Sequence, residues 1–251
     1  MKTAILADIH ANREALEACL AHARRHGAER FALLGDFVNY GADPIACLDI
    51  VRELAAGGAA VRGNHDEAAL GGLAEEMNPV AREALYWTRR QLGAGERDFL
   101  AALPHGAILG DALLVHASAD KPATWPYIIG APQATRCLMA AEQTVVLAGH
   151  VHQPLLYHLP MESAGTGART FAPTPGVSIP LSARRRWLIM AGSVGQPRDG
   201  NCAAAYSLYD DRPGARAVTF FRVPYDHPGA ARKIVAAGLP GTLAWRLSRG
   251  Y

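Results

Sequence analysis

The stretch TAILADIHAN, residues 3–12, sets a pattern that recurs through the first part of the sequence. An apolar run of strand length ends in two side chains that can bind a metal, Asp8 and His10. Four later apolar runs end in the same manner, before Asp36, Asn64 with His65, His116, and His150 with His152. Segments of helix length separate these runs, which is typical of buried strands in an α/β sheet. Ligands of such sheets bind at the carboxyl ends of the strands.

The residue types at these strand ends suit a pair of divalent metals. Two ions roughly 3.5–4 Å apart need a shared carboxylate, neutral imidazoles and open positions for hydroxide and substrate. Each cluster alone has an ordinary explanation: Asp8 could cap the helix that begins near Asn12, and Asp36 could belong to a turn. A lone His116 is more often a core histidine than a ligand. All five clusters in this order, however, predict a two-metal hydrolase.

The clusters resemble the ordered signatures of the calcineurin-like metallophosphoesterases. The matching segments are ADIHAN (7–12), LGDFVNYG (34–41), RGNHDE (62–67), LLVHAS (113–118) and AGHVHQP (148–154). The segment GSVGQPRDG (192–200) resembles the closing motif of a bacterial branch similar to diadenosine tetraphosphatases and serine/threonine protein phosphatases. The resemblance implies an α/β fold, a four-layer α/β/β/α sandwich of two mixed β-sheets flanked by helices.

The resemblance also implies the roles of the site residues. One metal would be held by Asp8, His10, Asp36 and His152, and the other by Asp36, Asn64, His116 and His150. A hydroxide bridging both ions would attack phosphorus in line, because two cations lower the pKa of the bound water far below its bulk value. His65 would assist an oxygen of the phosphoryl group, and Asp66 would orient His65 and favour its imidazolium form. We expect Mn²⁺, with Fe or Zn as alternatives.

The residues after the bridging Asp36 depart from the family pattern. The protein-phosphatase branch uses an Arg near this place to hold phosphate through two hydrogen bonds. Here Phe37, Val38, Asn39 and Tyr40 follow Asp36, and no Arg is among them. We therefore expect a small phosphorylated substrate, such as a nucleotide, rather than a phosphoprotein.

Four further residues are candidate contacts for that substrate. Arg198 offers a planar fork for a phosphate, and an aromatic ring could stack on a base. Tyr127 follows the fourth signature closely, and Asn12 ends the first. Phe171 lies in a Gly- and Pro-rich insertion at 160–186, which is either a loop over the active site or a surface hairpin.

Other function classes stay open at this point. The expected activity is hydrolysis of a phosphomonoester, a phosphodiester or a nucleotide polyphosphate. One alternative is a serine/threonine phosphoprotein phosphatase, and another is a non-catalytic binding protein with this fold. The second is disfavoured because every expected ligand and His65 are present. An amidohydrolase is disfavoured because its usual His-x-His opening is missing.

Length and charge bound the remaining possibilities. The 251 residues suit one domain without a linker, and the net charge of +2 does not predict a nucleic-acid partner. The chain enters a strand directly after Met1-Lys2, and no segment approaches the roughly 20 apolar residues of a membrane span. We expect a cytoplasmic protein, and a homo-oligomer is left open.

Sequence periodicity predicts the elements that carry the motifs. Strands are expected at 3–7, 31–34, 59–62, 111–116, 144–148 and 155–159, and helices at 12–26, 44–56, within 67–102 and at 132–141. Later strands at 187–191, 203–209 and 217–223 indicate a second sheet. The tail, residues 226–251, predicts two short helices broken at Gly238-Leu239-Pro240. This tail is basic and amphipathic: it caps the core in the favoured interpretation, and it lies on a membrane or contacts a partner helix in the other.

Overall fold

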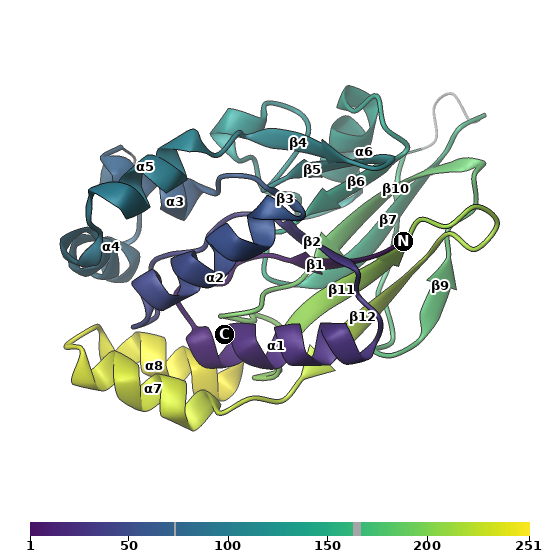
Figure 1. Ribbon diagram of the computed structural model, residues 1–251. Coiled ribbons are helices and arrows are strands. Elements are labelled where there is room, and N and C mark those ends of the chain that lie inside the picture. The colour runs from purple at the N-terminus through teal and green to yellow at the C-terminus, as the bar shows by residue number, and fades with distance from the viewer. Residues whose placement is uncertain (73, 163–166) are drawn as a thin grey trace.

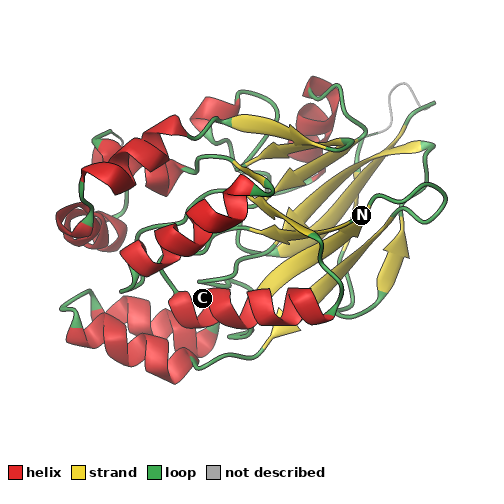
Figure 2. Cartoon of the chain, in the orientation of Figure 1, coloured by secondary structure: helices red, strands yellow, loops and turns green. Residues whose placement is uncertain are grey.

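The computed structural model describes residues 1–72, 74–162 and 167–251. Two mixed β-sheets pack face to face, and helices cover the outer face of each (Figure 1, Figure 2). The predicted four-layer α/β/β/α sandwich is therefore confirmed. None of the helices in these ranges is long and apolar enough to cross a membrane.

The first sheet has the strand order β3-β2-β1-β11-β12-β9. Its strands are β1 (Lys2–Leu6), β2 (Arg30–Leu33), β3 (Ala59–Ala60), β9 (Ser178–Pro180), β11 (Ala204–Asp210) and β12 (Ala217–Val223). Strands β1, β2 and β3 are parallel, so the loops that follow them meet at one edge of the sheet. These three loops carry the first three signatures. Helices α1 (Arg13–Arg25) and α2 (Pro44–Ala56) pack on the outer face.

The second sheet has the order β4-β5-β6-β10-β7-β8. It is made of β4 (Gly106–Leu109), β5 (Ala112–Val115), β6 (Val145–Ala148), β7 (Pro154–Pro160), β8 (Arg169–Phe171) and β10 (Arg185–Ala191). Strands β5, β6 and β10 are parallel, and the loops after them carry the fourth, fifth and closing motifs. Helix α6 (Ala131–Ala140) covers the outer face of this sheet.

Three apolar layers hold the sandwich together. The layer between the two sheets buries side chains such as Ile5, Leu147 and Phe220. The outer layers join α1 and α2 to the first sheet and α6 to the second. Removing such side chains from water is the main favourable contribution to folding, so the strand ends that project from this core have a rigid base.

The remaining helices form a group beside the sandwich. They are α3 (Asn64–Leu70), α4 (Pro79–Gln91), α5 (Ala94–Ala102), α7 (His227–Ala236) and α8 (Gly241–Arg249), with short 3₁₀ turns η1 (Ala74–Glu76) and η2 (Pro122–Thr124). Apolar side chains of α7 and α8 pack against α4 and Tyr40. The C-terminal tail therefore packs against the rest of the protein, and its Leu243 and Leu247 are buried.

The insertion at 160–186 differs from a simple loop. Residues 163–166 lie outside the described residues, and the remainder forms two three-residue strands, β8 and β9. β8 pairs with β7 at the edge of the second sheet, and β9 pairs with β12 at the edge of the first. Such short, exposed strands leave no apolar alternation in the sequence, which is why neither was predicted.

Candidate metal centre

The predicted ligands sit on strand-end loops in an uncommon backbone conformation. Five of them have a positive φ: Asp8 (54°), His10 (48°), Asp36 (54°), His150 (70°) and His152 (59°). A left-handed non-glycine residue costs about 1–3 kcal/mol and persists only where its surroundings hold it. Here neighbouring loops do so, because the His10 N–H donates to the Asp36 carbonyl at 2.9 Å and the Asp8 N–H donates to the Gly35 carbonyl at 3.1 Å.

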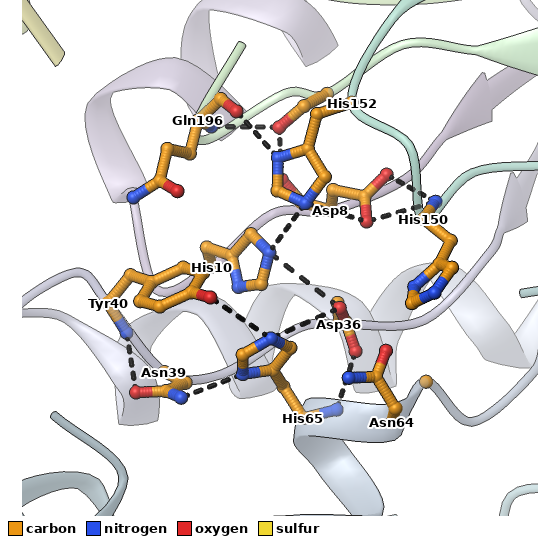
Figure 3. Close-up of polar contacts among 12 residues, drawn as sticks. Asp8, His10, Asp36, Asn39, Tyr40, Asn64, His65, His150, His152 and Gln196 are labelled. Carbon is orange, nitrogen blue, oxygen red and sulfur yellow. Dashed lines mark hydrogen bonds and ion pairs between the residues drawn. The ribbon is translucent and has the colours of Figure 1, made fainter. Parts of the chain in front are cut away.

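Two groups of buried donor atoms could each hold a metal ion. The first consists of Asp8, His10, Asp36 and His152, and the second of Asp36, His116 and His150. Within each group the donor atoms lie within 4.8 Å of one another, and Asp36 belongs to both. The Asn64 Oδ1 lies 3.1 Å from the His116 Nε2, beside the second group. Figure 3 shows most of these side chains converging on Asp36. All seven predicted ligands are thus brought together.

Backbone carbonyls orient three of the imidazoles. Nδ1 of His10, His116 and His152 lies 3.1, 2.6 and 2.6 Å from the carbonyl oxygens of Val38, Leu34 and Gln196. An Nδ1–H that donates to a carbonyl leaves the Nε2 lone pair free, which is the tautomer that binds a metal.

The arrangement fits a cation between these lone pairs. Nε2 of His10 and Nε2 of His152 lie only 3.3 Å apart. Among the described residues, Asp36 Oδ2 and His150 Nε2 are buried and have no hydrogen-bond partner. Such buried polar atoms are costly unless a ligand satisfies them. The donor set therefore fits divalent metal ions.

Burial sets the charge of these groups. It lowers the pKa of His150 to about 3 and holds the pKa of His10 and of His152 well below its ordinary value, so these imidazoles are neutral. Burial alone would raise the pKa of Asp36, but the imidazoles of His116 and its neighbours lower it well below the ordinary value. His116 is the exception: burial lowers its pKa, but the charge of Asp36 outweighs this and raises it to about 9. Metal binding requires neutral imidazoles around an ionised carboxylate, so an ion held by His116 would displace its proton.

His65 stands beside the two groups without belonging to either. Its backbone N–H donates to Asp36 Oδ1 at 2.8 Å. Its Nδ1 lies 2.7 Å from the amide nitrogen of Asn39, and its Nε2 lies 3.3 Å from the Tyr40 hydroxyl. Because the Asn39 oxygen accepts from the Tyr40 N–H, its NH₂ group is the donor toward His65. His65 therefore carries its proton on Nε2, toward Asp36 and the site.

Asp66 does not make the contact expected of it. Its carboxylate oxygens accept the backbone N–H groups of Gly63, Asp36 and Phe37 at 3.0, 2.8 and 2.8 Å, and thereby fix the loop that carries Asp36. Asn39 contacts His65 instead. Burial also lowers the pKa of His65 to about 4, so the imidazolium form is not favoured. The sequence offered one signal for Asn39, namely its position three residues after Asp36.

Comparison with known proteins agrees with this geometry. The family model described as calcineurin-like phosphoesterase superfamily domain matches residues 1–210. The chain belongs to this superfamily. Its sequence is 39% identical to that of a metallophosphoesterase from Sphaerobacter thermophilus, whose crystal structure aligns over 100% of this chain and 99% of that chain with a TM-score of 0.87.

Two archaeal proteins are also similar over nearly their whole length. The chain is 32% identical to uncharacterized protein MJ0912 of Methanocaldococcus jannaschii over 252 residues, which are 98% of this chain and 97% of that protein. The crystal structure of hypothetical protein PH1004 from Pyrococcus horikoshii OT3 aligns with a TM-score of 0.78 at 21% identity, over 100% and 98% of the two chains. The similarity to PH1004 shows that the two proteins share a fold.

In this phosphoesterase-superfamily chain, a pocket of about 710 Å³ opens beside the metal-binding groups. Arg198 and Tyr127, two of the predicted substrate contacts, line it. The Tyr127 ring lies 4.0 Å from the His150 ring, between centroids, and the Arg198 guanidinium lies 5.9 Å from the centre of the Tyr40 ring. Arg198 therefore lies beside Tyr40, which belongs to the segment after Asp36 that has no Arg of its own.

The structure does not bring the other two candidate contacts to this pocket. Asn12 caps α1, since its Oδ1 accepts from the Ala15 N–H at 3.2 Å, and its amide donates to the Gly195 carbonyl at 2.9 Å. Phe171 lies on β8 at a sheet edge and is 48% exposed. The pocket is instead completed by residues that the sequence did not single out, Trp125, Arg246 and Tyr251.

Proposed function

We propose that the chain is a binuclear metal-dependent phosphoesterase. The observation that carries this proposal is the pair of buried donor groups that share Asp36. Membership of the calcineurin-like phosphoesterase superfamily supports hydrolysis of a phosphoester. Divalent ions held there would activate a water for attack on phosphorus, and an alcohol or a second phosphate would leave.

Each part of the site has a role in this proposal. The first ion would be held by Asp8, His10, Asp36 and His152, and the second by Asp36, Asn64, His116 and His150. Divalent ions there would supply an activated water and neutralise phosphoryl charge, with Mn²⁺ favoured and Fe or Zn as alternatives. His65 would donate from Nε2 to an oxygen of the phosphoryl group. Asn39 positions His65, and Asp66 positions the loop of Asp36.

A small phosphorylated substrate, with a nucleotide favoured, is proposed over a phosphoprotein. The pocket volume of about 710 Å³ falls in the range of sites for small molecules. Arg198 offers a fork for phosphate, and Tyr127 offers a ring for a base. A serine/threonine phosphoprotein phosphatase remains the second candidate, because the donor groups describe the phosphoryl centre and not the leaving group.

Chelation and metal replacement test the proposal. Purified protein is treated with a chelator, its metal content is measured, and hydrolysis of bis(p-nitrophenyl) phosphate and p-nitrophenyl phosphate is followed after adding back Mn²⁺, Fe²⁺ or Zn²⁺. We expect activity to disappear with the metals and to return with Mn²⁺. Full activity in protein shown to be free of metal would contradict the proposal.

A further inference from the structure

The pocket next to the metal-binding groups contains two arginines from distant parts of the chain. Arg198 comes from the segment after β10, and Arg246 comes from α8. Both side chains line this one pocket together with Tyr40, and the Arg198 guanidinium lies 5.9 Å from the centre of the Tyr40 ring.

Neither arginine is neutralised by an acidic side chain in the described part of the chain. Arg198 donates to the neutral Gln196 amide at 3.2 Å, and its Nε is buried without a hydrogen-bond partner among the described residues. Arg222 and Arg216, by contrast, form ion pairs with carboxylates. A partly buried guanidinium without an anion is a ready site for one.

The position of Arg246 is fixed by the way the tail is anchored. Leu243 and Leu247 of α8 are buried against α4 and Tyr40. The Gly250 carbonyl accepts from the Gly200 N–H at 2.9 Å, two residues after Arg198. A Cβ at position 250 would lie 2.5 Å from the Asn201 backbone nitrogen, so the end of α8 lies directly on the segment that carries Arg198.

We propose that Arg246 and Arg198 bind a second phosphate group, linked to the one that is hydrolysed. This inference rests on the proposed function and specifies its substrate as a molecule with two linked phosphates. In the reaction a water oxygen bonds to the phosphorus nearest Asp36, and the bond from that phosphorus to the bridging oxygen breaks. The bridging oxygen keeps the electron pair and leaves on the second phosphate, and the proton of the water passes to solvent. The arginines balance the charge that develops on the leaving phosphate.

The test compares Arg246→Gln with Arg249→Gln, an exposed arginine of the same helix. Calorimetric titration measures the binding of AMP, of the methylene analogue of ADP, and of methylenediphosphonate. In Arg246→Gln we expect the Kd of both diphosphate analogues to rise roughly 10- to 100-fold, as for the loss of a hydrogen-bonded ion pair, and the Kd of AMP to rise far less. Arg249→Gln should bind all three as the wild type does.

Three results would overturn the inference. In Arg246→Gln, these are an equal rise in Kd for AMP and for the diphosphate analogues, an unchanged Kd for every ligand, and a higher Kd for the ADP analogue without a higher Kd for methylenediphosphonate. The last would assign Arg246 to the nucleoside. Thermal unfolding of both variants checks that α8 stays packed. Arg246→Lys keeps the charge but loses the planar guanidinium, so its Kd for the diphosphate analogues should lie between those of the wild type and of Arg246→Gln. The proposed function fails separately, when wild-type protein with added Mn²⁺ hydrolyses no phosphoester.

Discussion

The two walls of the pocket are built in different ways. The metal wall consists of the predicted ligands and His65, of which Asp36, Asn64, His65, His150 and His152 line the pocket. All of these side chains except the half-buried Asn64 are buried, and hydrogen bonds from adjacent loops hold most of them. The substrate wall, which comprises Trp125, Tyr127, Arg198, Arg246 and Tyr251, presents several half-exposed side chains, and Tyr127 is 54% exposed. A rigid metal wall suits one fixed reaction at phosphorus. A looser opposite wall suits the choice of the group attached to it.

Because of this difference, we expect substitutions on the two walls to affect activity in different ways. Changes on the metal wall should remove activity toward every phosphoester, because all substrates share the reaction at phosphorus. Changes on the substrate wall should instead alter the preference among substrates, mainly through KM.

The largest effect is expected from Asp36→Asn. Asp36 belongs to both donor groups, so the variant should lose both ions and at least about 10³-fold in kcat for every substrate. Metal analysis and hydrolysis of p-nitrophenyl phosphate measure this. Asp49→Asn is the control, because that carboxylate is 61% exposed on α2. Retention of both metals by Asp36→Asn would show that it is not the shared ligand.

A somewhat smaller loss is expected from His65→Ala. Its Nε2 faces the site without belonging to either donor group, so kcat for a poor leaving group should fall by roughly 10²–10⁴-fold. The metal content should stay near that of the wild type. A loss of metal equal to that in Asp36→Asn would place His65 among the ligands instead.

Asn39→Ala should weaken the reaction through His65. Without the amide 2.7 Å from its Nδ1, the imidazole can rotate or change tautomer, and kcat should fall by roughly 10- to 100-fold with little change in KM. The NMR shifts of the His65 ring nitrogens give an independent readout of the tautomer. Unchanged shifts together with a reduced kcat would contradict a positioning role.

The smallest effects compare two aromatic residues of similar exposure. Tyr127 is 54% exposed in the pocket, and Phe171 is 48% exposed at a sheet edge. If a base stacks on Tyr127, Tyr127→Ala should raise KM for nucleotides about fivefold or more, whereas Phe171→Ala should change it less than about twofold. Equal effects would remove the distinction between a substrate wall and the rest of the surface.

The metal wall could be predicted from sequence because each of its motifs is local. An apolar strand followed at once by Asp or His identifies the ligand and its place, and parallel strands bring the loops together. His65 and Asp36 were found in this way. The contact between Asn39 and His65 was not, because it is a side-chain contact between the loop after β2, where Asn39 and Tyr40 have a positive φ, and α3.

The substrate wall could not be predicted in this way because distant parts of the chain form it. Arg246 reaches the pocket only when α8 packs against α4, and the periodicity of α8 shows that it has an apolar face without showing what the face contacts. Phe171 was favoured as an aromatic residue in the Gly- and Pro-rich insertion at 160–186. The pairing of β8 with β7 places it instead at a sheet edge. Tertiary packing, rather than any motif, decides which aromatic residue reaches the pocket.

The anchoring of Gly250 on the Arg198 segment has a practical consequence for anyone who prepares this protein. Tyr251 lines the pocket, so an affinity tag fused after it would leave the protein at the mouth of the site. A tag fused before Met1 would leave from the opposite end of β1, where the terminal amine pairs with Asp211. Recombinant protein carrying its tag at the first position, or with a C-terminal tag removed, is therefore the material on which substrate screens should be run.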